Sequence, residues 1–214
     1  MLQKITALRQ QKRNHKRVNV YLDGQYAFAL QASTAAPLRV GQGLTPEEID
    51  RLQKHDAAEI AYDKALHFLS YRPRSRAEVA DYLKRRKAQP DTVHTVLERL
   101  EHAGLVDDTA FAQYWVENRE SFRPRGSRAL RHELRQKGVA EGVIAQTVEG
   151  IDETDSAYRA AHRRARQLGQ LDYQAFRRRL GGFLQRRGFG YDVVKETVDR
   201  LWRELRAARE TELS

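Results

Sequence analysis

The chain has 214 residues, with 39 Lys and Arg against 29 Asp and Glu, so its formal net charge is +10. It has no cysteine, which excludes a disulfide framework, thiolate catalysis and any metal site built from cysteine. No apolar run approaches the roughly 20 residues of a membrane span, and the N-terminus lacks an apolar signal core. We therefore expect a cytoplasmic protein that does not bind membranes and has an acidic partner.

Residues 17–30 predict a β-hairpin. Three apolar side chains alternate there with polar or aromatic ones: Val18, Val20 and Leu22. Asp23 and Gly24 suit the positive φ angles of a two-residue type I′ turn. An isolated hairpin is marginally stable, so residues 5–11 are expected to add a third strand.

The expected turn also fixes a register for this hairpin. Tyr21 would lie opposite Tyr26, and Val20 would lie opposite Ala27. Phe28 would then share one face with the two tyrosines. We interpret that aromatic face as ordinary core in preference to a platform for stacking bases.

The pattern becomes helical after residue 43. Thr45 predicts an N-cap and Glu48 closes a capping box, with Pro46 in the first turn. An internal repeat of about 50 residues follows, a period typical of stacked helical modules. It is anchored by three dipeptides that end in leucine, each followed by a basic stretch: Tyr82-Leu83, Glu133-Leu134 and Phe183-Leu184.

Apolar residues keep the same spacing around each anchoring leucine. They stand four residues before it and ten, fourteen and seventeen after it: Val79, Val93, Leu97, Leu100; Leu130, Ile144, Val148, Ile151; Leu180, Val194, Val198, Leu201. Spacings of three and four define one face of a helix, so each unit contains two amphipathic helices. Gly138 and Gly188 are predicted to cap the middle helices of the second and third units.

A further helix precedes each pair, at about 56–71, 108–121 and 155–168, with Asp108 and Asp155 as expected N-caps. Ser75 and Glu78 predict a capping box at the start of the first middle helix. The predicted fold is mostly α: three tandem three-helix repeats in an elongated, curved array after a small β-hairpin and helix module. The expected domains are 1–54, 55–106, 107–153 and 154–214.

The sequence contains no recognisable active site. The histidines lie in separate elements, and His94 and His102 share a predicted helix without a third ligand. Asp107 and Asp108 form an acid pair that a helix cap explains, and a phosphate-binding glycine loop is absent. We therefore expect no enzyme, no metal and no cofactor.

Basic residues recur at equivalent positions of the units. They occupy the loop before the middle helix (Arg72, Arg74, Arg76; Arg123, Arg125, Arg128) and the end of that helix (Lys84, Arg85, Arg86, Lys87; Arg135, Lys137; Arg186, Arg187). Cations at a helix C-terminus also stabilise the helix dipole, which is an equally good explanation for any one of them. The recurrence of the set favours a track for a polyanion.

The run from Leu69 to Leu83, LSYRPRSRAEVADYL, resembles the RecX family of regulators of the RecA recombinase. Gly104-Leu-Val-Asp-Asp108 and Arg186-Arg-Gly-Phe189 are similar to the junctions and third unit of that family. The resemblance covers essentially the whole chain. It implies a non-catalytic protein that binds the groove of the RecA–single-stranded-DNA filament and mainly inhibits ATP hydrolysis, strand exchange and coprotease activity.

That resemblance places the protein in recombination, DNA repair and the SOS response, with the RecA filament and single-stranded DNA as partners. Nothing in the sequence demands a dimer, and we expect a monomer. Double-stranded DNA is a further candidate partner. The candidate binding residues are the basic residues of the three units: Arg72, Arg74, Arg76, Lys84, Arg85, Arg86; Arg123, Arg125, Arg128, Arg135, Lys137; and Arg177, Arg178, Arg186, Arg187.

Two alternatives belong to other classes of function. A stand-alone DNA-binding protein or transcriptional regulator could use paired helices as a helix-turn-helix. The third helices of the units, however, begin near Asp91, Glu141 and Asp192, which places acids where a reading helix meets phosphate. A nuclease would require a cluster of metal-binding carboxylates that the sequence does not provide.

Overall fold

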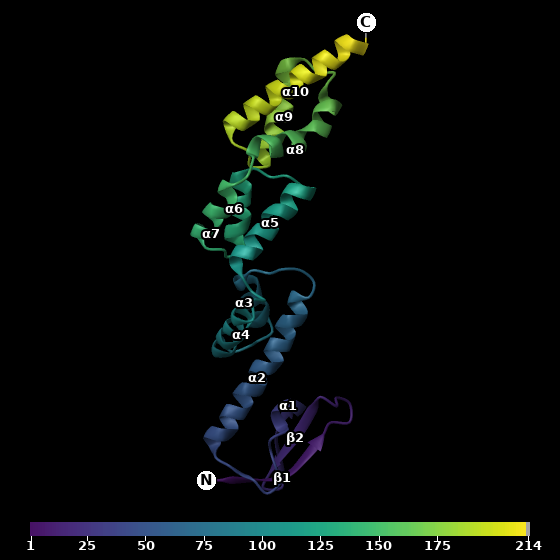
Figure 1. Ribbon diagram of the computed structural model, residues 1–214. Coiled ribbons are helices and arrows are strands. Elements are labelled where there is room, and N and C mark those ends of the chain that lie inside the picture. The colour runs from purple at the N-terminus through teal and green to yellow at the C-terminus, as the bar shows by residue number, and fades with distance from the viewer. Residues whose placement is uncertain (213–214) are drawn as a thin grey trace. The chain divides into compact units, whose positions relative to one another are not determined.

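The computed structural model describes residues 1–212, and within them every strand lies before residue 45 and the remainder of the fold is helical (Figure 1). The chain divides into two units, Met1–Arg72 with Val79–Leu105, and Pro73–Glu78 with Val106–Ser214. The mostly helical fold class is confirmed, while the four domain boundaries and the curved array stay predictions. Over the described residues, no helix is both long and apolar enough to cross a bilayer.

The N-terminal residues form a four-stranded antiparallel sheet in the order β3-β2-β1-β4. Its elements, with a short helix after the third strand, are β1 (Gln3–Gln10), β2 (Arg17–Leu22), β3 (Gln25–Gln31), α1 (Ala32–Ala35) and β4 (Gly43–Leu44). The hairpin and the third strand are confirmed. Asp23 and Gly24 form the turn with φ angles of 48° and 86°, as a type I′ turn requires.

The predicted register of the hairpin is only partly correct. Tyr21 pairs with Tyr26, but Val20 pairs with Phe28 and not with Ala27. The register shift leaves Ala27 as an extra residue, and one extra residue moves the following side chains to the other face. Phe28 is therefore buried in the core of the sheet, and the predicted aromatic face is wrong.

The first long helix, α2 (Pro46–Leu69), begins at the predicted capping box. The Glu48 N–H donates to Thr45 Oγ1, and the Thr45 N–H donates to Glu48 Oε2. The helix passes without interruption through the expected start of a separate helix at Asp56. That aspartate is buried, and Arg17 binds it at 2.8 Å, which holds the sheet against α2.

The remaining helices alternate as the repeat predicts. They are α3 (Arg76–Arg85), α4 (Pro90–His102), α5 (Asp108–Phe122), α6 (Ser127–Gln136), α7 (Glu141–Glu149), α8 (Glu153–Leu168), α9 (Tyr173–Arg186) and α10 (Tyr191–Glu212). The middle helices of the three repeats are α3, α6 and α9. Their anchoring leucines, Leu83, Leu134 and Leu184, have no exposed surface.

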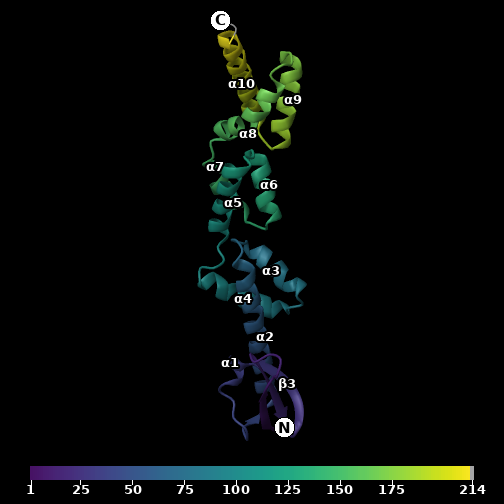
Figure 2. The same ribbon diagram turned by 90° about the vertical axis from the view of Figure 1, so that its right-hand side faces the viewer.

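The predicted apolar positions are buried, with one exception. Ile151 is only half-buried, because α7 ends at Glu149 and Gly150 follows, so Ile151 lies beyond the helix. Within the second unit the helices of the second repeat, α5, α6 and α7, enclose one core. The helices of the third repeat, α8, α9 and α10, enclose another (Figures 1 and 2).

Two predicted N-caps are wrong. Asp107 caps α5 by accepting from the N–H groups of Thr109 and Ala110. Asp152 similarly caps α8. In both cases the aspartate with extended backbone just before the helix makes the cap, because its carboxylate can reach back over the first turn. Asp108 instead accepts from the Arg76 N–H at 2.8 Å.

Gly138 and Gly188 cap the middle helices as predicted, with φ angles of 74° and 88°. Both glycines also pack closely against another repeat. A Cβ on Gly138 would lie 2.4 Å from Ala77 Cβ, and a Cβ on Gly188 would lie 2.5 Å from Ala129 Cβ. Lys87, at the equivalent place in the first repeat, has a φ of 62°.

These contacts define a joint in which the N-terminus of one middle helix meets the C-terminus of the next. At the joint formed by Ser75–Glu78 with Lys137–Gly138, Ser75 Oγ donates to the Lys137 carbonyl at 2.6 Å. At the joint formed by Gly126 with Arg187–Gly188, the Gly126 N–H donates to the Arg187 carbonyl at 3.0 Å. Each bond gives a partner to a carbonyl at the C-terminus of a middle helix, where backbone carbonyls have no partner within the helix.

The substitution Gly188→Ala should lower the free energy of unfolding by about 2–4 kcal/mol, since it combines left-handed backbone strain with a clash against α6. The matched control is Gly142→Ala, a helical site with open space, which should stabilise by up to about 1 kcal/mol. Urea unfolding followed by circular dichroism measures both. A loss of only about 1 kcal/mol for Gly188→Ala, the backbone strain alone, would contradict close packing at the joint.

Candidate anion-binding surface at the repeat joints

The candidate basic residues fall into two groups by exposure. The exposed ones are Arg76, Lys84, Arg85, Arg86, Arg123, Arg128, Arg135, Arg177, Arg178 and Arg186. The partly buried ones are Arg72, Arg74, Arg125, Lys137 and Arg187. The half-buried residues lie at the loops and helix ends that form the joints, where a cation is partly removed from water.

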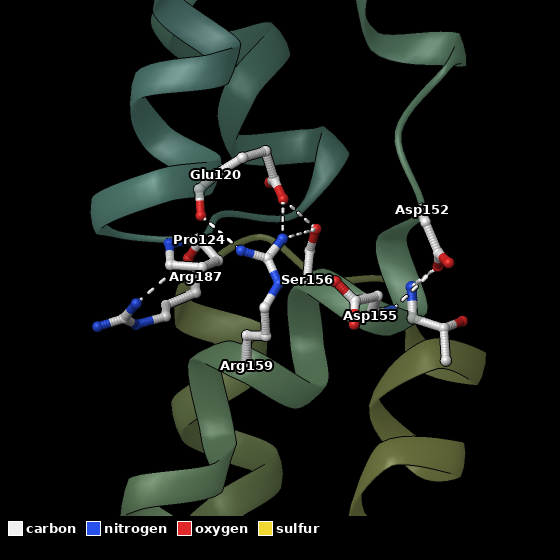
Figure 3. A network of polar contacts seen from close by, with 8 residues as sticks. Glu120, Pro124, Asp152, Asp155, Ser156, Arg159 and Arg187 are labelled. Atoms are coloured by element: carbon white, nitrogen blue, oxygen red, sulfur yellow. Dashed lines mark hydrogen bonds and ion pairs between the residues drawn. The ribbon is translucent and has the colours of Figure 1, made fainter.

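Three arginines converge at the joint of the second and third repeats. Arg187 donates from Nη1 to the Pro124 carbonyl at 3.2 Å, and Arg123 and Arg125 flank that proline in the chain (Figure 3). Burial lowers the pKa of Arg187, and the positive charges of Arg123 and Arg125 lower that pKa further. The three guanidinium groups therefore form a cluster of like charge.

The carboxylate of Glu133 lies beside this cluster, and other groups already use it. Glu133 accepts from Trp115 Nε1 and from Arg119 Nε, each at 2.8 Å. Arg125 Nε lies 3.5 Å from the second oxygen of Glu133, and this buried nitrogen makes no hydrogen bond. One negative charge is thus shared between two guanidinium groups, which leaves the arginine cluster with excess positive charge.

The other joint has the same plan with its charge neutralised. Lys137, the residue equivalent to Arg187, binds Glu78 Oε1 at 2.7 Å. In the second repeat, Ala129 occupies the position equivalent to Glu78, so this position offers no carboxylate to Arg187. The structure therefore places Lys137 in an ion pair and leaves Arg187 with a carbonyl as its acceptor.

Arg135 is also paired, although it is exposed. Its Nε and Nη2 donate to the two carboxylate oxygens of Glu141 at 2.8 and 2.7 Å. These hydrogen bonds lower the pKa of Glu141. An exposed ion pair contributes little to stability, so a stronger anion could displace Glu141 from Arg135.

The end of α3 in the first unit is organised around aromatic rings. Phe68 and Tyr82 stack with ring centroids 4.1 Å apart, and the Arg86 guanidinium lies 4.4 Å from the centre of the Tyr82 ring. The stack positions Arg86, while Lys84 and Arg85 are exposed beside it.

Arg177 and Arg178 line a hollow of 380 Å³ between α9 and α10. Gly181 and Gly182 line it as well, and Lys195 adds a third cation. Among the described residues that line the hollow, none is an Asp or a Glu. The adjacent glycines, which are unusual inside a helix, leave the space that side chains would otherwise occupy.

The arginine-rich stretch from 159 to 187 is not uniformly a binding surface. Arg159 donates from Nη2 to Glu120 at 2.6 Å and from Nη1 to the Glu120 carbonyl at 2.7 Å. The Ser156 hydroxyl donates to the same Glu120 carboxylate (Figure 3). This network joins α5 to α8, so Arg159 stabilises the contact between repeats.

Sequence reasoning missed two exposed aromatic residues beside the basic loops. Tyr71 is 69 % exposed and Phe122 is 82 % exposed. Each directly precedes an Arg-Pro-Arg sequence, and the two stand at the same distance before their anchoring leucines. Comparison of the repeats at those positions would have found them.

Within residues 1–212, no group of three His, Asp or Glu side chains is placed to hold a metal ion. The fold and its surface define a class: a tandem three-helix-repeat protein with clustered cations at the joint of its second and third repeats. Four family models match the chain in order. They are the RecX N-terminal domain (residues 3–43) and the first (61–100), second (107–148) and third (151–198) RecX three-helix domains.

Relatives of known name agree with these matches. "Regulatory protein RecX" of Bacillus subtilis (strain 168) is 30% identical over 202 residues, covering 92% of this chain and 76% of that protein. The protein of that name from Lactobacillus johnsonii is 31% identical over 92% of this chain and 74% of its own length. A crystal structure of regulatory protein RecX superposes with a TM-score of 0.73 at 27% identity, over 92% of this chain and all of that one.

The chain belongs to the RecX family. The structure of RecX from Lactobacillus salivarius, 21% identical with a TM-score of 0.63, shares the fold over 69% of this chain and 97% of that one. The relatives are named regulatory proteins.

The substitution Glu141→Gln should raise the affinity for a polyanion about two- to threefold, because it frees Arg135 from its ion pair. Glu149→Gln, which changes the net charge equally at the end of the same helix, is the control. Fluorescence anisotropy with a labelled oligonucleotide measures both affinities. Equal gains in the two variants would mean that Arg135 takes no part in binding.

Proposed function

We propose that this protein is a non-catalytic regulator that binds the groove of the RecA–single-stranded-DNA filament in the cytoplasm. There it modulates, and mainly inhibits, RecA ATP hydrolysis, strand exchange and coprotease activity during recombination and DNA repair. The family membership of the whole chain supports a regulatory role. The RecX–RecA relation itself is what the resemblance of the sequence implies.

The observation that carries the proposal is the presence of incompletely compensated cations in the second and third repeats. Arg123, Arg125 and Arg187 converge at one joint, and Arg177 and Arg178 line a hollow in the last repeat. A filament repeats its own phosphates and subunits at a fixed interval. A chain of similar modules can meet such a partner with the same contact several times.

The alternative of a helix-turn-helix regulator is less well supported. A recognition helix presents its N-terminal residues to base edges in the major groove. The third helices here carry an acid in the first turn: Asp91 in α4, Glu141 in α7 and Asp192 in α10. A carboxylate at that position repels the phosphates on either side of the groove.

The direct test is to titrate the protein into the DNA-dependent ATPase reaction of the cognate RecA at about 150 mM salt, where exposed charges are screened. Binding to the same bare strand is measured in parallel. We expect inhibition at concentrations far below those that coat bare DNA. Inhibition that begins only as the bare strand becomes coated would mean competition for DNA, and no inhibition would contradict the proposed function.

Replacing Arg72, Arg74 and Arg76 together with Gln should raise the half-inhibitory concentration about tenfold or more, since several charge-assisted contacts are lost. The matched control replaces Lys12, Arg13 and Lys16 with Gln, which removes the same charge from the exposed β1–β2 loop. Circular dichroism checks that both variants fold. An equal effect in the control would show that only net charge matters and that the loop is not a specific contact.

A further inference from the structure

The loops before the first two middle helices share a four-residue pattern. An aromatic residue is followed by Arg-Pro-Arg in both, as Tyr71-Arg-Pro-Arg74 and Phe122-Arg-Pro-Arg125. The equivalent residues of the third repeat, Asp172-Tyr-Gln-Ala175, lack it. The pattern therefore occurs at the repeats whose middle helix begins at a joint.

The aromatic side chain of each pattern faces solvent. Phe122 is the last residue of α5 and is 82 % exposed, the highest value apart from Met1 among the large apolar side chains whose exposure the structure describes. Tyr71 is 69 % exposed and is held in place, because its hydroxyl lies 3.1 Å from His67 Nε2 and its ring packs edge-on against that histidine. Neither ring serves the core, so core packing does not explain an aromatic residue at these positions.

The guanidinium groups beside Phe122 suit a phosphate better than a carboxylate. Arg187 donates to the Pro124 carbonyl, and the positive charges of Arg123 and Arg125, which flank Pro124, act on Arg187, so three forked donors lie at one short loop. A carboxylate offers two oxygens, whereas a phosphodiester adds two bridging oxygens to its two charged ones and continues to the next phosphate. Ala129 in place of an acid leaves Arg187 without a carboxylate of the protein's own at that position.

We propose that Phe122, Arg123, Arg125 and Arg187 form a one-nucleotide site for single-stranded DNA, with the base stacked on the Phe122 ring and the phosphate on the arginines. The Tyr71 loop is the second copy of this pattern. The inference rests on the proposed function only in taking DNA as the polyanion. A single strand is required, since the faces of its bases are open to an aromatic ring, whereas those of a duplex are stacked inside.

The first test compares two labelled strands of about 15 nucleotides, one of thymidines and one of stable abasic analogues with the same phosphates. Phe122→Ala should weaken binding of the thymidine strand about tenfold and leave binding of the abasic strand unchanged. Val40→Ala, which removes a side chain that is 63 % exposed from the N-terminal unit, is the control and should change neither. Equal losses on both strands, or no loss on either, would overturn the proposal.

A second variant reports on stacking directly, through a fluorescence signal that does not depend on the binding affinity. Phe122→Trp places an indole at the site, and its fluorescence should be quenched when the thymidine strand binds but not when the abasic strand binds. The wild-type signal of Trp115 and Trp202 is subtracted as background. An indole signal that stays unchanged at saturating thymidine strand would contradict stacking at residue 122.

The phosphate half of the site has its own readout. Arg187→Gln should weaken binding of the thymidine strand and of the abasic strand by the same factor. It should also reduce the slope of log affinity against log salt concentration by about 0.7, the value for one phosphate of a single strand. An unchanged slope would overturn the assignment of Arg187 to phosphate. If the loop instead held a carboxylate-rich protein segment, neither strand would respond to Phe122→Ala or Arg187→Gln.

These measurements contain no RecA, so their outcome is separate from that of the ATPase titration. Stacking without regulation of RecA would support the one-nucleotide site and contradict the proposed function. Regulation of RecA without stacking would overturn the site and leave the proposed function standing.

Discussion

The second unit depends on one contact, the meeting of the N-terminus of a middle helix with the C-terminus of the next. A helix end leaves N–H or C=O groups without partners, and the aligned peptide dipoles give the two ends opposite partial charge. Where the two helix ends meet, the Ser75 hydroxyl donates to the Lys137 carbonyl, and the Gly126 N–H donates to the Arg187 carbonyl. Gly138 and Gly188 are required because a side chain at either position would overlap the adjoining alanine.

The same contact also places the charges. The cations that cap a middle helix, Lys137 and Arg187, are brought beside the Arg-rich loop of the preceding repeat by the joint itself. Whether the charge is neutralised then depends on one residue of the preceding middle helix. Glu78 neutralises Lys137, while Ala129 leaves Arg187 among like charges. Two joints with one backbone plan thus differ in their electrostatics, which is why we assign the uncompensated joint to a polyanion.

The sequence predicts the repeat well because each unit needs the same buried face. The three anchoring leucines and the residues spaced around them account for the helices, their cores and the two capping glycines. The hairpin register could not be read in the same way, because a bulge adds one residue without a sequence signal and moves Phe28 into the core. The N-caps of α5 and α8 were misplaced by one and three residues, because another aspartate just upstream of each predicted cap makes the cap instead.

The candidate surface was harder to predict than the fold, since charge spacing along the chain does not reveal partners in space. The sequence predicts that Arg135, Lys137 and Arg125 bind an anion, yet each has a carboxylate of the protein within ion-pair distance. Arg159 belongs to the arginine-rich stretch at 159–187, yet it forms an ion pair with Glu120 that links α8 to α5. The exposed Phe122 was overlooked because an aromatic residue in an amphipathic helix is usually assigned to the core.

The most direct test of the account is hydrogen–deuterium exchange of the whole chain, free and bound to the RecA–single-stranded-DNA filament. We expect slower exchange at the joint segments 122–129 and 185–190 on binding, with little change in the β1–β2 loop at 12–16. Protection confined to the N-terminal strands, with the joint segments unchanged, would contradict the claim that the repeat joints form the binding surface.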